Sequence, residues 1–291
     1  MSSRKKDERI FKFKRKNLDY IYSKYNKRAL VNPDPLVFLY DYPDPREREI
    51  VGLIASSLAY GRVKQILKDV SFLLDTMKPS LMNFITRNKH DFFLKTFGPF
   101  KHRFTTGDDI AALLSGIKNV LEKYGSLENC FAAGYKNNGN NIIAGLEFFV
   151  TELSSCFENS RTYLLPAPSK GSACKRLNLY LRWMIRQDDV DPGGWTSVPA
   201  SALFIPLDTH MYQICSAAGM TERKTADFKT VIEISENFRK INPEDPVKYD
   251  FALTRFGIRE ELDWSHLCEG LNESQNSSRL DAIRSIPPSR P

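Results

Sequence analysis

The sequence has few cysteines, and their spacing does not group them. The five cysteines are scattered along the chain and never occur as Cys-x-x-Cys. A disulfide framework, a structural zinc site and an iron–sulfur cluster all need clustered thiolates. We therefore expect no disulfide framework, metal, iron–sulfur cluster or other cofactor, and the expected location is a reducing cytoplasm.

Long apolar runs and alternating patterns are also missing. No segment approaches the roughly 20 apolar residues that a membrane-spanning helix needs. The first residues, MSSRKKDERIFKFKRK, lack the apolar centre of a signal peptide, and we expect no membrane partner. Apolar and polar residues never alternate long enough to predict a sheet. The predicted fold class is all-α.

The chain has ample apolar residues and an excess of basic charge. With 291 residues, 42% of them hydrophobic, it can form a large core or two smaller lobes. Its 42 Lys and Arg against 35 Asp and Glu give a net charge of +7, which favours a polyanionic partner such as nucleic acid. We expect a monomer.

Helical periodicity and prolines divide the chain into segments. Residues 1–45 are predicted to be a basic helix followed by a proline-rich connector, both packing on the C-terminal lobe. Residues 46–162 form a helical lobe, 163–204 a hairpin-like segment with a helix and loop, and 205–262 the C-terminal helices. The polar, proline-rich residues 270–291 are predicted to be disordered.

Several helix boundaries can be predicted from residue chemistry. Gly61 should separate two helices. Thr106, with Asp109 three residues on, should form a capping box. A later helix should begin with Asp245 as its cap and Pro246 as its first residue.

Asp208 occupies the boundary at which an apolar segment becomes a helix, within IPLDTHMYQICSAAGM. Asp is a common N-cap because its carboxylate accepts hydrogen bonds from free backbone N–H groups. The same carboxylate, fixed beside an apolar wall, is also a preorganised negative charge that can stabilise a developing cation. Capping alone and capping combined with catalysis both stay open.

A turn-like segment, SKGSACKR, precedes the helix over KRLNLYLRWMIR. Gly171 permits a tight turn, and Ser172 can cap the helix. Lys175 is expected in the first helical turn with Arg176 beside it, while Lys170 lies earlier in the hairpin. A turn of this kind can present backbone N–H groups to a phosphate.

The LDTH segment, the helix over FKTVIEISENFRKI and the segment DPVKYDFALTRFGI together resemble the C-terminal half of helix-hairpin-helix (HhH-GPD) DNA glycosylases. The hairpin lacks the usual pair of glycines, which makes it more similar to the archaeal 8-oxoguanine glycosylase branch. The motifs AYGRVKQI, CKRLNLYLRWMIR, DVDPGGW and PVKYDFAL resemble an uncharacterised bacterial family, domain of unknown function 2400, over nearly the whole chain.

The glycosylase resemblance implies a two-lobed fold and excision of a damaged base, such as an oxidised purine, from duplex DNA. Asp208 would stabilise positive charge on the sugar. Either Lys175 or Lys170 would be the amine that forms a Schiff base and gives AP-lyase activity.

The resemblance also suggests DNA- or substrate-binding residues. These are Lys170, Gly171, Ser172 and Arg176 in the hairpin segment, Tyr60 and Arg62 at the early helix break, Trp195 for stacking on an extruded base, and His210 as a support for Asp208. For Tyr60 and Arg62 a plain helix break stays open, and for Trp195 so does a gap-filling role.

Two other classes of function stay open. One is a nucleic-acid-binding protein without catalysis, and the other is a metabolic enzyme with a small-molecule site. An acidic cleft without basic residues beside the hairpin would favour the metabolic enzyme.

Overall fold

The computed structural model describes residues 13–158, 162–258, 262, 266–267 and 271. The described chain is mostly helical, in agreement with the predicted all-α class. The predicted tail over 270–291 lies outside the described residues except for Leu271, as does the N-terminal part of the basic helix before residue 13.

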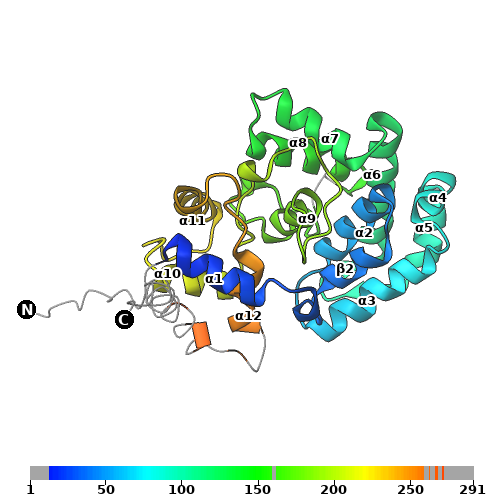
Figure 1. Cartoon of the computed structure of the whole chain (residues 1–291). Helices are drawn as coiled ribbons and strands as arrows, with labels where there is room; N and C mark the ends of the chain where they lie inside the picture. The colour runs from blue at the N-terminus through cyan, green and yellow to red at the C-terminus, as the bar shows by residue number, and fades with distance from the viewer. Residues whose placement is uncertain (1–12, 159–161, 259–261, 263–265, 268–270, 272–291) are drawn as a thin grey trace, which may run out of the picture.

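Helices from the N-terminal half of the chain lie mostly at one end of the molecule, and helices from its C-terminal third lie at the other end (Figure 1). The α-helices are α1 Arg15–Tyr25, α2 Pro45–Ser57, α3 Val63–Thr76, α4 Leu81–Arg87, α5 His90–Phe97, α6 Gly107–Tyr124, α7 Leu127–Lys136, α8 Ile142–Leu153, α9 Lys175–Ile185, α10 Thr209–Ala217, α11 Phe228–Ile241 and α12 Asp250–Ile258. The 3-10 helices are η1 Arg28–Leu30, η2 Pro35–Asp41, η3 Ser154–Cys156, η5 Pro168–Lys170 and η6 Ala200–Ala202. Two short antiparallel strands, β1 Lys101–His102 and β2 Thr105–Thr106, form a hairpin.

Helices α2 and α9 form the centre of the molecule. Every residue from Glu49 to Ser57 of α2 is buried, as is every residue from Arg176 to Met184 of α9. The two helices approach closely, because a Cβ atom on Gly52 would lie 3.1 Å from Cε2 of Tyr180. Since α9 is enclosed in this way, the residues at its N-terminus are held in a fixed position.

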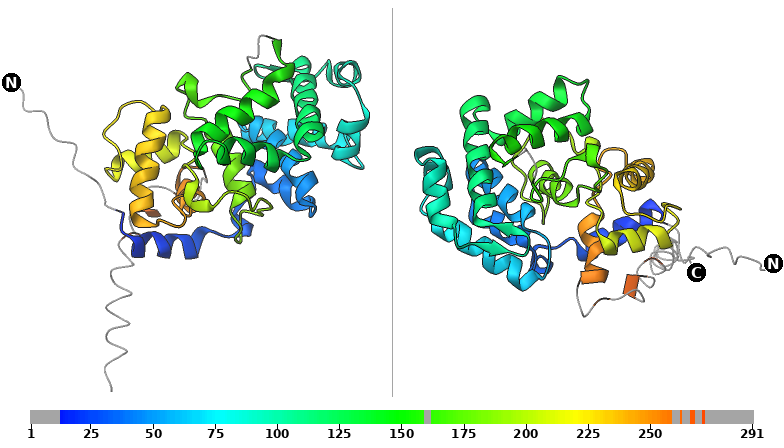
Figure 2. Two further views of the ribbon diagram at one scale, coloured as in Figure 1. Left: turned by 90° about the horizontal axis from the view of Figure 1, so that it is seen from above. Right: turned by 180° about the vertical axis from the view of Figure 1, so that it is seen from behind.

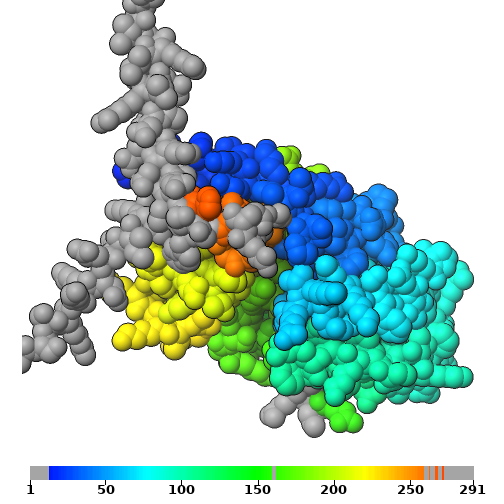
Figure 3. Space-filling model, turned by 90° about the horizontal axis from the view of Figure 1, so that it is seen from below, coloured from blue at the N-terminus to red at the C-terminus, as the bar shows by residue number. Residues whose placement is uncertain are grey.

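The N-terminal helix packs against the C-terminal part of the chain. Helix α1 contacts α12, and Asn17 Nδ2 donates to the backbone oxygen of Leu271 at 2.6 Å. Figure 2 shows α1 beside α12 in both views. Seen from below, the N-terminal segment runs from the C-terminal helices towards α2 and α3 (Figure 3).

Two of the predicted helix boundaries are confirmed and one is wrong. Gly61 has a φ of 97° between α2 and α3, and Thr106 and Asp109 form the capping box of α6. Helix α12, however, begins at Asp250 rather than at Pro246. The Asp245 carboxylate instead accepts from Arg186 Nε at 2.9 Å, so it joins an ionic cluster and does not cap the helix.

This buried ionic cluster connects α9 to the loop that follows it and to α12. Arg182 bonds to Asp250 and, through Nε at 3.1 Å, to Asp191. Arg186 bonds to Asp191 and, at 2.8 Å, to Asp188. Removing one member of a buried charge pair costs about 3–5 kcal/mol, because the remaining charge is left without a partner.

Asp188 ties α1 to the same cluster, since Tyr22 Oη donates to its carboxylate at 2.9 Å. Burial opposes ionisation of Asp188, but the charge of Arg186, two backbone N–H groups and the Tyr22 hydroxyl outweigh burial and lower its pKa to about 2. The ionised form therefore stabilises the fold above the pKa that an unfolded chain would have.

Replacing Asp188 with Asn should lower the free energy of unfolding by about 2 kcal/mol above pH 4. The difference from wild type should shrink as the pH falls from about 4 to about 2, because the folded-state pKa is the lower one. Urea denaturation at a series of pH values measures this difference. Asp189→Asn is the matched control, because Asp189 is 69% exposed and pairs with Lys27 at 3.6 Å. A difference that stays constant from pH 7 to pH 2 would contradict the assignment.

Candidate functional site

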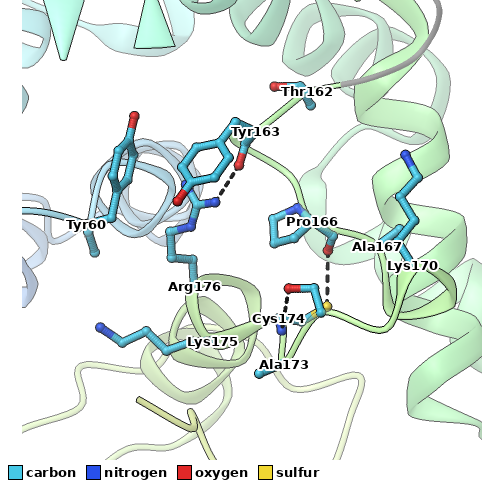
Figure 4. A pocket seen from close by; sticks show the side chains of 12 residues that line it. Tyr60, Thr162, Tyr163, Pro166, Ala167, Lys170, Ala173, Cys174, Lys175 and Arg176 are labelled. Atoms are coloured by element: carbon cyan, nitrogen blue, oxygen red, sulfur yellow. Dashed lines mark hydrogen bonds between the residues drawn. The ribbon is translucent and has the colours of Figure 1, made fainter. Parts of the chain in front are cut away.

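A cavity of about 410 Å³ lies between the end of α2 and the segment that leads into α9. Figure 4 shows Tyr60 and Tyr163 on one side of this cavity and Lys170 on the other. Its wall is formed by Ala59, Tyr60, Thr162, Tyr163, Pro166, Ala167, Lys170, Ser172, Ala173, Cys174, Lys175 and Arg176. The cavity therefore brings the predicted hairpin residues together with Tyr60, which is distant in sequence.

The hairpin-like segment is a 3-10 turn followed by α9. Gly171 has a φ of 75°, as a tight turn requires, and η5 precedes it. Ser172 does not cap α9, which is a correction to the sequence prediction. The N-cap is Cys174, which has a φ of 48°, and the Ser172 hydroxyl accepts from the Cys174 N–H at 3.3 Å. Burial raises the pKa of the Cys174 thiol to about 12, so this thiol is no nucleophile at neutral pH.

Asp208 is the N-cap of α10, as predicted. Its Oδ1 accepts from the Met211 N–H at 2.8 Å, while its Oδ2 lies 4.0 Å from Nζ of Lys175. The side chains of Lys175 and Asp208 are 33% and 21% exposed, so both are accessible. Lys175 and Asp208, which are distant in the sequence, thus lie close together in the fold, whereas their chemical roles stay predictions.

The two hairpin lysines differ in their surroundings. Lys175 is the first residue of α9 and belongs both to the cavity wall and to the pair with Asp208. Lys170 is exposed at the end of η5 and also lines the cavity. Figure 4 shows the two side chains pointing away from one another. Of the two lysines, Lys175 is the one that pairs with Asp208.

Arg176 does not lie on the surface where a DNA backbone could contact it. It is 8% exposed and donates to the carbonyl oxygens of Ser57, at 2.7 Å, and Tyr163. Its guanidinium also lies 4.9 Å from the ring centre of Tyr60. Burial lowers the pKa of Arg176. Arg176 therefore fixes the cavity wall, and its predicted role in DNA binding is corrected to a structural one.

Trp195 is buried in the core and cannot stack on an extruded base from this position. It is 4% exposed, and its indole N–H donates to Glu49 Oε2 at 3.0 Å. The gap-filling alternative therefore describes Trp195. Burial of Trp195 is favourable because its indole N–H has a carboxylate partner on the central helix α2. That partner, Glu49, is distant from Trp195 in the sequence.

Of the other predicted residues, Tyr60 belongs to the cavity wall, whereas Arg62 and His210 do not. Tyr60 is half-buried in the cavity wall, and Arg62 is exposed at the start of α3. His210 packs against α12, because a Cβ atom on Gly257 would lie 2.5 Å from its Nδ1. This contact places His210 in the joint between α10 and α12.

The sequence prediction missed Tyr163. This residue is 54% exposed, and its ring centre lies 5.0 Å from that of Tyr60. The only feature of the sequence that could have pointed to Tyr163 is that it is an aromatic residue, next to Leu164, in a segment without helical periodicity. The contact with Tyr60 arises from packing between segments that are far apart in the chain.

Comparison with known families identifies the chain. The model of the family described as protein of unknown function DUF2400 matches residues 34–259. The chain belongs to this DUF2400 family. No curated protein and no solved structure matches the chain. The match to DUF2400 includes Lys175, Asp208 and the whole cavity wall.

Among the described residues of this DUF2400 chain, no three His, Cys, Asp or Glu side chains are grouped so that they could hold a metal ion. None of its described helices is long and apolar enough to cross a membrane.

Replacing Asp208 with Ala should lower the free energy of unfolding by about 1 kcal/mol, because α10 loses its cap. Asp208→Asn should change stability much less, since Asn is an equally good N-cap. Urea denaturation of the two variants measures the difference. Equal losses in both variants would show that the carboxylate charge, rather than the cap, stabilises this helix.

Proposed function

We propose that this protein is a DNA glycosylase that excises a damaged base, such as an oxidised purine, with associated AP-lyase activity. The observation that carries the proposal is the position of Lys175. Lys175 belongs to the cavity wall, and its amine lies 4.0 Å from the carboxylate that caps α10. A nucleophile paired with a proton acceptor at a cavity is the arrangement that covalent catalysis uses.

The chemistry that these residues can perform is displacement of the base at the sugar. Lys175 Nζ forms a bond to C1′ of the deoxyribose, while the bond from C1′ to the base breaks and its electron pair leaves with the base. Asp208 accepts the proton lost by the amine and passes it to the departing base. The nitrogen lone pair then forms a C1′=N double bond while the C1′–O4′ bond breaks and O4′ takes a proton from water, which gives a Schiff base between Lys175 and C1′. Loss of a proton from C2′ to water and departure of the 3′ phosphate then cleave the strand.

Asp208 has a second role in this proposal. Cleavage of the glycosidic bond develops positive charge on the sugar, and a fixed carboxylate lowers the energy of that state. The bond from the Met211 N–H fixes the Asp208 carboxylate before substrate binds. Such preorganisation avoids the cost of reorienting the charge during the reaction.

The arrangement of helices is compatible with the proposed two-lobed HhH-GPD fold. Helices α2 to α8 lie at one end of the molecule, and α1 and α10 to α12 lie at the other, with α9 between them (Figure 1). The described cavity wall contains two accessible basic side chains, Lys170 and Lys175, besides the buried Arg176, and no carboxylate. This composition favours a polyanionic substrate over the alternative of a metabolic enzyme with an acidic cleft.

The direct test is incubation with duplexes that contain 8-oxoguanine, uracil or an abasic site, in the presence of borohydride. Wild type should form a covalent adduct, and Lys175→Gln should form none. Asp208→Asn should reduce base release by at least about a hundredfold while DNA affinity is retained, because the cap persists and only the charge is lost.

Lys170→Gln separates the two candidate amines, since it should leave the adduct unchanged. Lys136→Gln, an exposed lysine at the end of α7, is the control for a general loss of positive charge. If wild type releases no base and forms no adduct on any of these duplexes but still binds them, the protein is a nucleic-acid-binding protein without catalysis.

A further inference from the structure

The hairpin formed by β1 and β2 exposes an aromatic side chain beside the cavity. Lys101 pairs with Thr106 and His102 with Thr105, which leaves Arg103 and Phe104 as the two turn residues. Phe104 is 67% exposed, the largest exposed fraction among the described large hydrophobic side chains. Arg103 has a φ of 51°, a conformation that costs energy for a residue other than glycine.

The hairpin is held rigidly by buried polar contacts. His102 is buried, with Nδ1 2.6 Å from Asp69 Oδ2 and Nε2 2.9 Å from the Tyr60 carbonyl oxygen. The Tyr60 hydroxyl in turn donates to the His102 carbonyl oxygen at 2.9 Å. The fold therefore fixes an apolar ring in water, and the packing of the described chain gives no reason for that exposure.

The exposed ring continues into the aromatic side of the cavity. The ring centre of Phe104 lies 5.7 Å from that of Tyr163, and that of Tyr163 lies 5.0 Å from that of Tyr60. Tyr60 and Tyr163 both line the cavity that contains Lys175. The three rings lead from the protein surface to the candidate reactive amine.

Exposed basic groups lie on the hairpin and at the start of α3. Arg62, Lys101 and Arg103 are exposed, and the Arg103 guanidinium lies 5.6 Å from the ring centre of Phe104. A second hollow, of about 340 Å³, is lined by Arg62, Gln65, His102 and Arg103. The hairpin and its flanks, residues 97–107, contain no acidic residue, and the two neighbouring carboxylates of Asp69 and Asp109 are bonded to His102 and Thr106. Exposed aromatic rings among cations match the chemistry of an unpaired nucleic-acid strand, in which bases stack and phosphates carry charge.

We propose that Phe104 stacks against an unpaired nucleobase that neighbours the nucleotide in the cavity, that Tyr163, whose ring is inclined by 70° to that of Phe104, contacts the edge of this base, and that Arg62 and Arg103 contact the flanking phosphates. This inference rests on one part of the proposed function, namely that the substrate is a nucleic acid. It adds that the substrate must present an unstacked base outside the cavity. A single strand, or a duplex with a locally opened base pair, meets this requirement, whereas an intact base stack does not.

The test is the affinity of the full chain for a fluorescein-labelled single-stranded oligothymidine, measured by anisotropy at several salt concentrations. Phe104→Ala should weaken binding roughly tenfold, as expected for the loss of one base–aromatic stack. The slope of log affinity against log salt should stay unchanged, because no phosphate contact is lost. Phe104→Trp should bind like wild type.

Two further variants separate stacking from charge. Phe92→Ala removes another exposed ring, 44% exposed on α5, and should bind like wild type. Arg103→Gln should reduce the salt slope by about 0.7, the value for one phosphate contact on a single strand. Thermal unfolding of Phe104→Ala should match wild type, since its ring is mostly in water.

Wild-type affinity in Phe104→Ala, an equal loss in Phe92→Ala, or no binding of the oligonucleotide by wild type would each overturn the stacking site. The glycosylase proposal is tested separately by base release. If no base is released but the Phe104 effect is present, only the glycosylase proposal fails. If base release is present and Phe104→Ala binds like wild type, only the stacking site fails.

Discussion

The bond network of Arg182 fixes the relative positions of the segments that form the candidate site. Arg182 lies seven residues after Lys175, about two turns of α9, so both side chains point to the same side of the helix. On that side Arg182 binds Asp250 of α12. Helix α12 packs against α10, whose cap is Asp208. The ion pair near one end of α9 therefore connects this helix, through α12 and α10, to the Asp208 cap that faces Lys175 at the other end.

The buried charges define geometry more than they add stability. Burial of Arg182, Arg186 and Asp191 removes water from charged groups, and their mutual attraction only offsets that cost. An apolar replacement could stabilise the chain equally well, but it would lose the directional bonds. Because each guanidinium has a fixed planar set of donors, the cluster permits one arrangement of α9, the following loop and α12.

The cavity depends on a second buried arginine. Arg176 binds the carbonyl oxygen that ends α2 and the one at Tyr163, and it lies 4.6 Å from the ring centre of Tyr163. These contacts hold the aromatic side of the cavity against the start of α9. A single turn of α9 thus combines a structural cation, Arg176, with a more accessible one, Lys175, and only the second can act on a ligand.

Local chemistry in the sequence was sufficient to predict the helical class, the break at Gly61, the capping box at Thr106 and the cap at Asp208, since each depends on residues within a few positions of one another. The sequence could not decide the environment of Arg176 or Trp195, because their partners Ser57 and Glu49 are distant in the chain. For the same reason it did not reveal the contact between Phe104 and Tyr163. Burial and long-range pairing belong to the tertiary structure, and they determine which of the predicted polar and aromatic side chains remain accessible to a substrate.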